Sequence, residues 1–87
     1  MFVVMVYDVR VKRVNRVLKK AREYLTWIQN SVLEGELTEA QFARLKSDVR
    51  GVIKEEEDSV AFYKLRTTQY LDKECLGVEK NKQDSFI

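Results

Sequence analysis

The chain has 87 residues with a formal net charge of +2, 45% of them are hydrophobic, and its main apolar run is Phe2 to Val6. That run is too short to span a membrane or to form a signal-peptide core, so the sequence predicts a cytoplasmic protein of one domain. With no histidine and one cysteine, the composition excludes Ser-His and Cys-His dyads, the usual zinc sites and an internal disulfide.

Charge is distributed unevenly along the chain. Residues 1–22 carry seven Lys or Arg against Asp8 alone, whereas residues 34–58 carry eight acidic side chains against four basic ones. This uneven distribution predicts a charged surface confined to one part of the protein rather than non-specific electrostatic binding by the whole surface.

The first predicted element is a strand over Phe2–Val6, which is followed by Asp8. A continuous apolar run rich in β-branched residues is typical of a strand covered on both faces, at the centre of a sheet. Because burying an unpaired carboxylate is costly, Asp8 must meet water, a cation or a hydrogen-bonding partner where the strand emerges. Two roles stay open: Asp8 caps the following helix, or it marks a functional site at the end of the strand.

An amphipathic helix is predicted next, because apolar residues recur at helical spacing. Its buried face consists of Val11, Val14, Val17, Leu18, Ala21 and Leu25. The opposite face carries the basic residues Lys12, Arg13, Arg16, Lys19 and Lys20. That face is either a binding surface for nucleic-acid phosphates or an ordinary solvated surface.

The middle of the chain predicts two short strands and a second helix. The strands are Thr26–Gln29 and Ser31–Leu33, with a bend or bulge at Gln29-Asn30 and a turn at Gly35. The helix is expected to begin at Thr38, because Thr38 to Gln41 fits a capping box and Leu37 and Phe42 fit a hydrophobic staple. Its apolar stripe is Phe42, Leu45, Val49, Val52 and Ile53. The acidic run Glu55–Asp58 after it is expected to be a solvated loop.

The last strong strand is Ser59–Leu65, which is apolar on both faces and is therefore expected to be central. The order β-α-β-β-α-β predicts an α+β, ferredoxin-like domain over residues 1–76, with a short extra C-terminal strand within Tyr70–Leu76. Residues 77–87 form a polar tail that ends in Phe86-Ile87. These two apolar residues are either disordered or dock on another protein.

Three stretches give the chain a family resemblance: Val6-Tyr7-Asp8-Val9, the Arg-rich first helix, and Ile28 to Gly35. Together they resemble the small CRISPR-associated family called Cas two. The family's aspartate falls on Asp8 and its helix arginine on Arg16. In place of a basic residue that the family often has, this chain has Trp27, which is expected to pack or stack.

The resemblance implies a ferredoxin-like homodimer that works with the CRISPR integrase in spacer acquisition and binds duplex DNA. It also implies metal-dependent endonuclease activity on RNA or DNA. For that activity we expect Asp8 to be catalytic and to hold Mg²⁺ or Mn²⁺, with the two copies of a dimer sharing one ion. Phe86 and Ile87 are expected to dock on the integrase. A free-standing ribonuclease toxin of the same fold and a non-catalytic DNA-binding scaffold are the alternatives.

Overall fold

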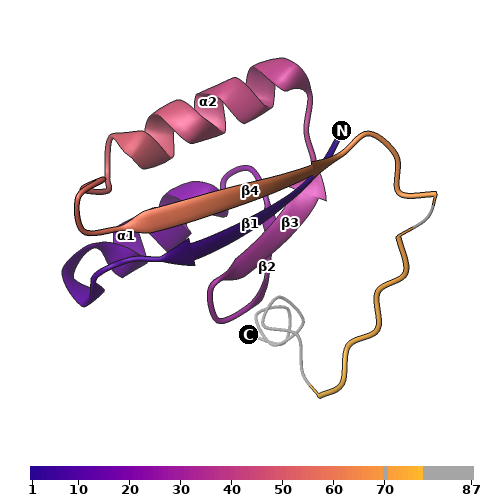
Figure 1. The fold of residues 1–87 in the computed structure, drawn as a ribbon, viewed down its shortest axis with the longest axis horizontal. Helices are drawn as coiled ribbons and strands as arrows, with labels where there is room; N and C mark the ends of the chain where they lie inside the picture. The colour runs from indigo at the N-terminus through magenta and orange to yellow at the C-terminus, as the bar shows by residue number, and fades with distance from the viewer. Residues whose placement is uncertain (70, 78–87) are drawn as a thin grey trace.

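The computed structural model describes residues 1–69 and 71–77, and its elements follow the predicted order (Figure 1). They are β1 (Phe2–Asp8), α1 (Val11–Ala21), β2 (Thr26–Gln29), β3 (Val32–Glu36), α2 (Glu39–Arg50) and β4 (Ser59–Leu65). The predicted α+β, ferredoxin-like fold is confirmed.

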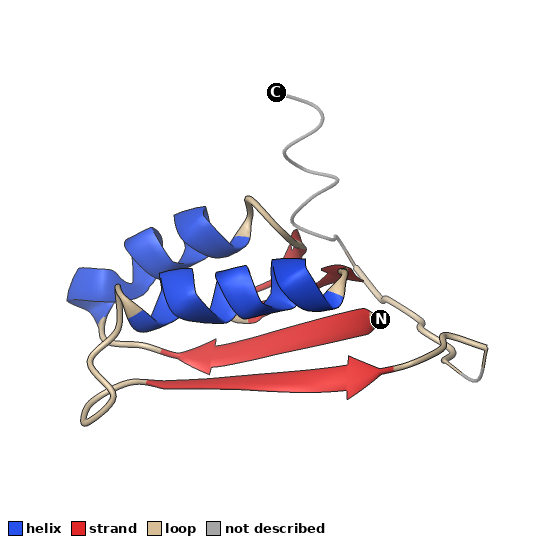
Figure 2. Ribbon diagram, turned by 90° about the horizontal axis from the view of Figure 1, so that it is seen from above, coloured by secondary structure: helices blue, strands red, loops and turns tan. Residues whose placement is uncertain are grey.

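The strands form one antiparallel sheet in the order β2-β3-β1-β4, and both helices cover the same face of it (Figure 2). Both helices lie on one face because right-handed crossovers place them there. β1 is central, as predicted. β4 is an edge strand of this single chain, so the prediction that it is central is wrong here.

The open face of the sheet explains a second departure from the predicted pattern. Val3 and Met5 of β1 are fully buried under the helices, whereas Val6 on the opposite face is 36% exposed. Tyr63 of β4, which lies opposite Val4 in the register, is 61% exposed. The prediction that β1 is covered on both faces is therefore wrong for the single chain.

The core lies between the helices and the sheet, and it follows helical spacing. Its buried helix residues are Val17 and Ala21 of α1 and Phe42, Leu45 and Val49 of α2. Val11 is 89% exposed, so its predicted place on the buried face is wrong. The buried side of α1 runs through Arg13, Val17 and Ala21, and at about 100° per residue Val11 lies about 160° away from Arg13.

The turn between β2 and β3 falls at Asn30, which has a φ of 37°, in agreement with the predicted bend at Gln29-Asn30. The predicted turn at Gly35 is wrong, because Gly35 lies within β3. A Cβ atom there would come within 3.2 Å of Leu25 Cδ2, so close packing rather than a turn requires the small residue.

The predicted start of the second helix is confirmed at Thr38. The hydroxyl Oγ1 of Thr38 accepts a hydrogen bond from the backbone N–H of Gln41 at 3.1 Å, and Gln41 Oε1 accepts one from the N–H of Thr38 at 2.8 Å. Leu37 and Phe42 are both buried in the core, as a hydrophobic staple requires.

Beyond β4, residues 71–77 form no strand, so the predicted extra strand is not formed in the single chain. Lys73 Nζ lies 3.4 Å from Glu34 Oε2 of β3 and brings this segment to the sheet. Tyr70, which begins the predicted strand, and the predicted docking residues Phe86 and Ile87 lie outside the described residues. Neither α1 nor α2 has the length and apolar character needed to cross a bilayer.

Candidate metal and nucleic-acid site

Asp8 is the last residue of β1 and its side chain is exposed. Its register partner on β4 is Ser59. The N-cap residue of α1 is Arg10, which makes no side-chain capping bond, so the predicted capping role of Asp8 is wrong. The physical reason is that Asp8 still belongs to the strand, two residues before the helix cap. Its carboxylate is therefore left to meet solvent or a ligand.

The surface around Asp8 is hollowed. A cavity of about 400 Å³ is lined by Asp8, Val9, Arg10, Val11 and Glu57. A second cavity, of about 630 Å³, is lined by Arg10, Val11, Lys12 and Glu57. Carboxylates suited to a hard cation therefore adjoin cationic side chains suited to a phosphate.

A buried cluster of charged side chains fixes the backbone at Arg10, just before α1, and the sequence did not reveal this cluster. Arg13 Nε donates to Asp58 Oδ2 at 2.6 Å and Arg13 Nη2 to Asp58 Oδ1 at 3.0 Å. Arg13 Nη2 also donates to Glu57 Oε1 at 2.7 Å. The Asp58 carboxylate further accepts from the backbone N–H groups of Arg10, at 3.0 Å, and Lys54, at 2.9 Å.

These contacts correct two predictions. Arg13 is buried and ion-paired, so it is not part of an exposed nucleic-acid-binding face. Asp58 is buried as well, so the acidic run is not simply a solvated loop. The spacing of Arg13 from Val17 and Ala21, four and eight residues further on, is the signal that places it on the core side of α1.

The cluster shifts the protonation of its members in a consistent direction. The hydrogen bond from Arg13, followed by those from the backbone, holds the pKa of Asp58 well below its usual range. The same guanidinium lowers the pKa of Glu57, and the hydrogen bond to Asp58 raises the pKa of Arg13. All three groups are therefore charged at neutral pH.

The remaining basic residues of α1 form what we call the basic strip: Lys12, Arg16 and Lys19, which are exposed. At about 100° per residue they fall within about 60° of one another, so they share one face. Lys20 is only half-buried and pairs with Glu23 at 3.2 Å, which partly neutralises it. The basic strip begins next to the Asp8 cavity, because Lys12 lines the neighbouring cavity, and it continues along α1 through Arg16 and Lys19.

Trp27, which replaces a basic residue of the resembled family, packs as expected. Its indole lies against the core, and its Nε1 donates to the Asn30 carbonyl at 3.0 Å. The Arg22 guanidinium stands 5.4 Å from the centre of the indole ring. Tyr7 is also pinned to this turn, since its hydroxyl donates to the Asn30 carbonyl at 3.2 Å.

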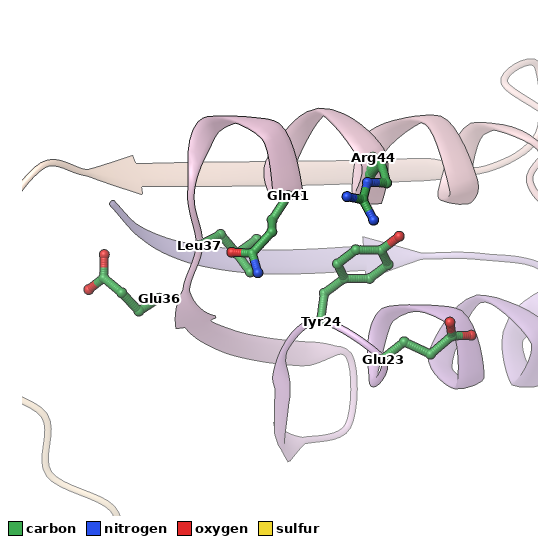
Figure 3. A pocket seen from close by; sticks show the side chains of 6 residues that line it. All are labelled: Glu23, Tyr24, Glu36, Leu37, Gln41 and Arg44. Atoms are coloured by element: carbon green, nitrogen blue, oxygen red, sulfur yellow. The ribbon is translucent and has the colours of Figure 1, made fainter.

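A further cavity lies at the other end of the helical layer, between the end of α1 and the start of α2 (Figure 3). Its volume is about 380 Å³, and it is lined by Glu23, Tyr24, Glu36, Leu37, Gln41 and Arg44. The Tyr24 hydroxyl donates to Asp48 Oδ2 at 2.6 Å, which ties the end of α1 to α2. None of the predicted site residues lines this cavity.

The carboxylates fit a metal ion only in part. Within residues 1–69 and 71–77, no group of three or more His, Cys, Asp or Glu residues is placed to hold a metal. Mg²⁺ commonly takes one or two carboxylates and fills its other positions with water and phosphate oxygens. Asp8 can supply one such ligand, and Glu57, which lines the same cavity, can supply a second.

The fold and the site define a small ferredoxin-like protein with an exposed carboxylate beside a basic helix. The chain belongs to the CRISPR associated protein Cas2 family, whose sequence model matches residues 1–73. The resemblance noted in the sequence is thereby confirmed.

Relatives in other organisms match the full length of this chain. The CRISPR-associated endoribonuclease Cas2 of Dictyoglomus turgidum is 58% identical over 87 residues, which cover 100% of both chains. The protein of the same name from Thermotoga maritima is 53% identical, with 100% of this chain and 99% of the relative covered.

Solved structures agree with this assignment. A crystal structure of cas2 superimposes with a TM-score of 0.81 at 45% identity, covering 92% of this chain and 90% of the other. Streptococcus pyogenes Cas2, crystallised at pH 6.5, gives a TM-score of 0.76 at 36% identity, covering 88% of this chain and all of the other.

Proposed function

We propose that the protein is a metal-dependent phosphodiester endonuclease of a cytoplasmic CRISPR system, with RNA as its substrate. The observation that carries the proposal is the exposed Asp8 carboxylate at the end of β1, in a cavity that Arg10 also lines. The relatives from Dictyoglomus turgidum and Thermotoga maritima, which carry the name endoribonuclease, favour RNA.

The chemistry follows from the residue types at this cavity. Asp8 would hold Mg²⁺ or Mn²⁺, and such an ion polarises a phosphate and lowers the pKa of a bound water. Arg10 and Lys12 would bind and orient the phosphate through charge-assisted hydrogen bonds. The chain has no histidine to act as a general base, so the cleavage relies on the metal site.

We also propose a homodimer built on the open face of the sheet. Val6 and Tyr63 remain exposed there, and within the described residues β4 pairs only with β1, so its outer edge can accept another strand. Asp8 lies on the same face as Val6, because successive strand residues alternate between faces. A two-fold axis near this end of β1 would bring two copies of Asp8 together and complete the shared metal site.

In the dimer the basic strip would be doubled and would bind duplex DNA along the phosphate backbone. This surface is the basis for a role in spacer acquisition together with the CRISPR integrase. The extra strand expected within Tyr70–Leu76 would pair with the partner chain, and Phe86-Ile87 would dock on the integrase.

The decisive experiment compares Asp8→Asn with the wild type on labelled single-stranded RNA and duplex DNA, with Mg²⁺, with Mn²⁺ and with a chelator. Asp8 makes no capping bond, so the substitution is expected to leave the melting temperature unchanged. Loss of the ion's charge stabilisation, about 3 kcal/mol, should slow cleavage about 100-fold.

Glu39→Gln is the matched control, because it removes an exposed carboxylate on α2. This variant should cleave at the wild-type rate. If the wild type cleaves neither substrate with any metal while it binds duplex DNA, the protein is a DNA-binding scaffold and the nuclease proposal is wrong.

A further inference from the structure

Asp58 joins three separate segments of the chain through one buried carboxylate. Its two oxygens accept hydrogen bonds from Arg13 on α1, from the N–H of Arg10 in the link between β1 and α1, and from the N–H of Lys54 in the loop after α2. The Asp58 side chain is completely inaccessible to solvent. Within the described residues, no buried side-chain nitrogen or oxygen lacks a partner, so the cluster is fully satisfied.

Stability alone does not explain such a cluster. Removing two charges from water is costly, and a buried ion pair can often be replaced by well-packed apolar residues with no loss of stability. The pair does something that an apolar pair cannot: its directional hydrogen bonds fix the backbone at Arg10 and Lys54 in one geometry.

Two of the segments that meet in this cluster adjoin Asp8. Arg10 follows Asp8 by two residues along the chain, and Asp58 directly precedes Ser59, the register partner of Asp8 across the sheet. Arg13 Nη2, while bound to Asp58, also holds the carboxylate of Glu57 at 2.7 Å. Glu57 lines the same cavity as Asp8.

We infer that Asp58 and Arg13 are positioning residues that hold the Asp8 and Glu57 carboxylates in one cavity for metal-dependent cleavage. This inference rests on the proposed nuclease function. In this inference Arg13 supports the site from the buried side of α1 and is not part of the surface that binds nucleic acid. Positioning of this kind commonly changes activity or metal affinity about 10- to 100-fold when it is lost.

The test compares three variants with the wild type: Asp58→Asn, Arg13→Lys and Asp48→Asn. Asp58→Asn keeps the shape of the side chain but loses the ion pair. Arg13→Lys keeps the positive charge but lacks the fork that binds Asp58 and Glu57 at once. Asp48→Asn is the matched control, since it alters another short side-chain hydrogen bond, from Tyr24, and Asp48 lines neither of the two cavities beside Asp8.

For each variant, kcat and KM are measured on labelled RNA at a temperature where circular dichroism shows the chain folded, and the affinity for Mn²⁺ is measured by electron paramagnetic resonance. Asp58→Asn should lower kcat and Mn²⁺ affinity about 10- to 100-fold while KM stays nearly constant, because the basic strip is intact. Arg13→Lys should show the same pattern with a smaller loss. Asp48→Asn should lower only the melting temperature.

Wild-type kcat and Mn²⁺ affinity in a folded Asp58→Asn would overturn the inference and leave the proposed function standing. If Asp58→Asn does not fold, Arg13→Lys decides in the same way. A wild type that neither binds Mn²⁺ nor cleaves RNA would refute the proposed function itself, and this inference with it.

Discussion

The salt dependence of DNA binding provides a quantitative test of the basic strip. If each of the exposed cations Lys12, Arg16 and Lys19 contacts one phosphate, the proposed dimer would make six contacts. At about 0.9 per contact, the slope of log affinity against log salt should be about −5, which corresponds to a loss of about 10³-fold between 50 and 200 mM salt.

Arg16→Ala removes one contact from each copy, so the slope should become shallower by about 2. Lys20→Ala should change it less, because Lys20 is already paired with Glu23. Fluorescence anisotropy with a labelled duplex, measured at four or five salt concentrations, gives the slope directly.

Arg50→Ala is the matched control, since Arg50 is an exposed cation on α2, away from the strip. An unchanged slope for Arg16→Ala, or an equal change for Arg50→Ala, would refute binding along α1. The buried Arg13 should add nothing to the wild-type slope.

Three further expectations concern stability. Thr38→Ala removes the capping box and should cost about 1 kcal/mol, which lowers the melting temperature by about 4–8 °C, whereas Thr38→Ser should not. Leu45→Ala, at a fully buried position, should cost about 2–5 kcal/mol in urea denaturation, while Val11→Ala should stay within about 0.5 kcal/mol despite the apolar pattern. The pKa of the Asp58 carboxyl is lower in the folded state than in the unfolded state. Its contribution to the free energy of unfolding is therefore present above the unfolded pKa of about 3.9 and is lost as the pH falls toward the folded pKa. Urea denaturation between pH 2 and 7 should show this loss of stability in the wild type and a smaller loss in Asp58→Asn.

Local signals predicted most of the fold. The capping box at Thr38 involves residues three apart, and the order of strands and helices follows from periodicity over short windows. The turn at Gly35 was predicted wrongly because glycine occurs both in turns and where two segments pack closely. Only the close approach of Leu25 in the structure distinguishes the two cases.

The candidate site was predictable only in part. Asp8 stands out as the single acid in a basic segment, but its freedom from a capping role depends on where β1 ends. The partners Arg13 and Asp58 are 45 residues apart, and charge patterns do not specify which acid meets which base over such a distance. Likewise, sequence hydrophobicity shows that β4 must be covered without showing whether this chain or another covers it.

The pairing of β1 with β4 has a consequence for how the protein is made. β1 is synthesised first, yet one of its two edges stays empty until Ser59–Leu65 has left the ribosome. Asp58, which accepts a hydrogen bond from the Arg10 N–H two residues after Asp8, is added at the same late moment. A nascent chain therefore carries Asp8 long before it carries an ordered site around it. In a protein that we propose to cut RNA, this order of assembly would leave the site incomplete while the growing polypeptide is still attached to its own messenger.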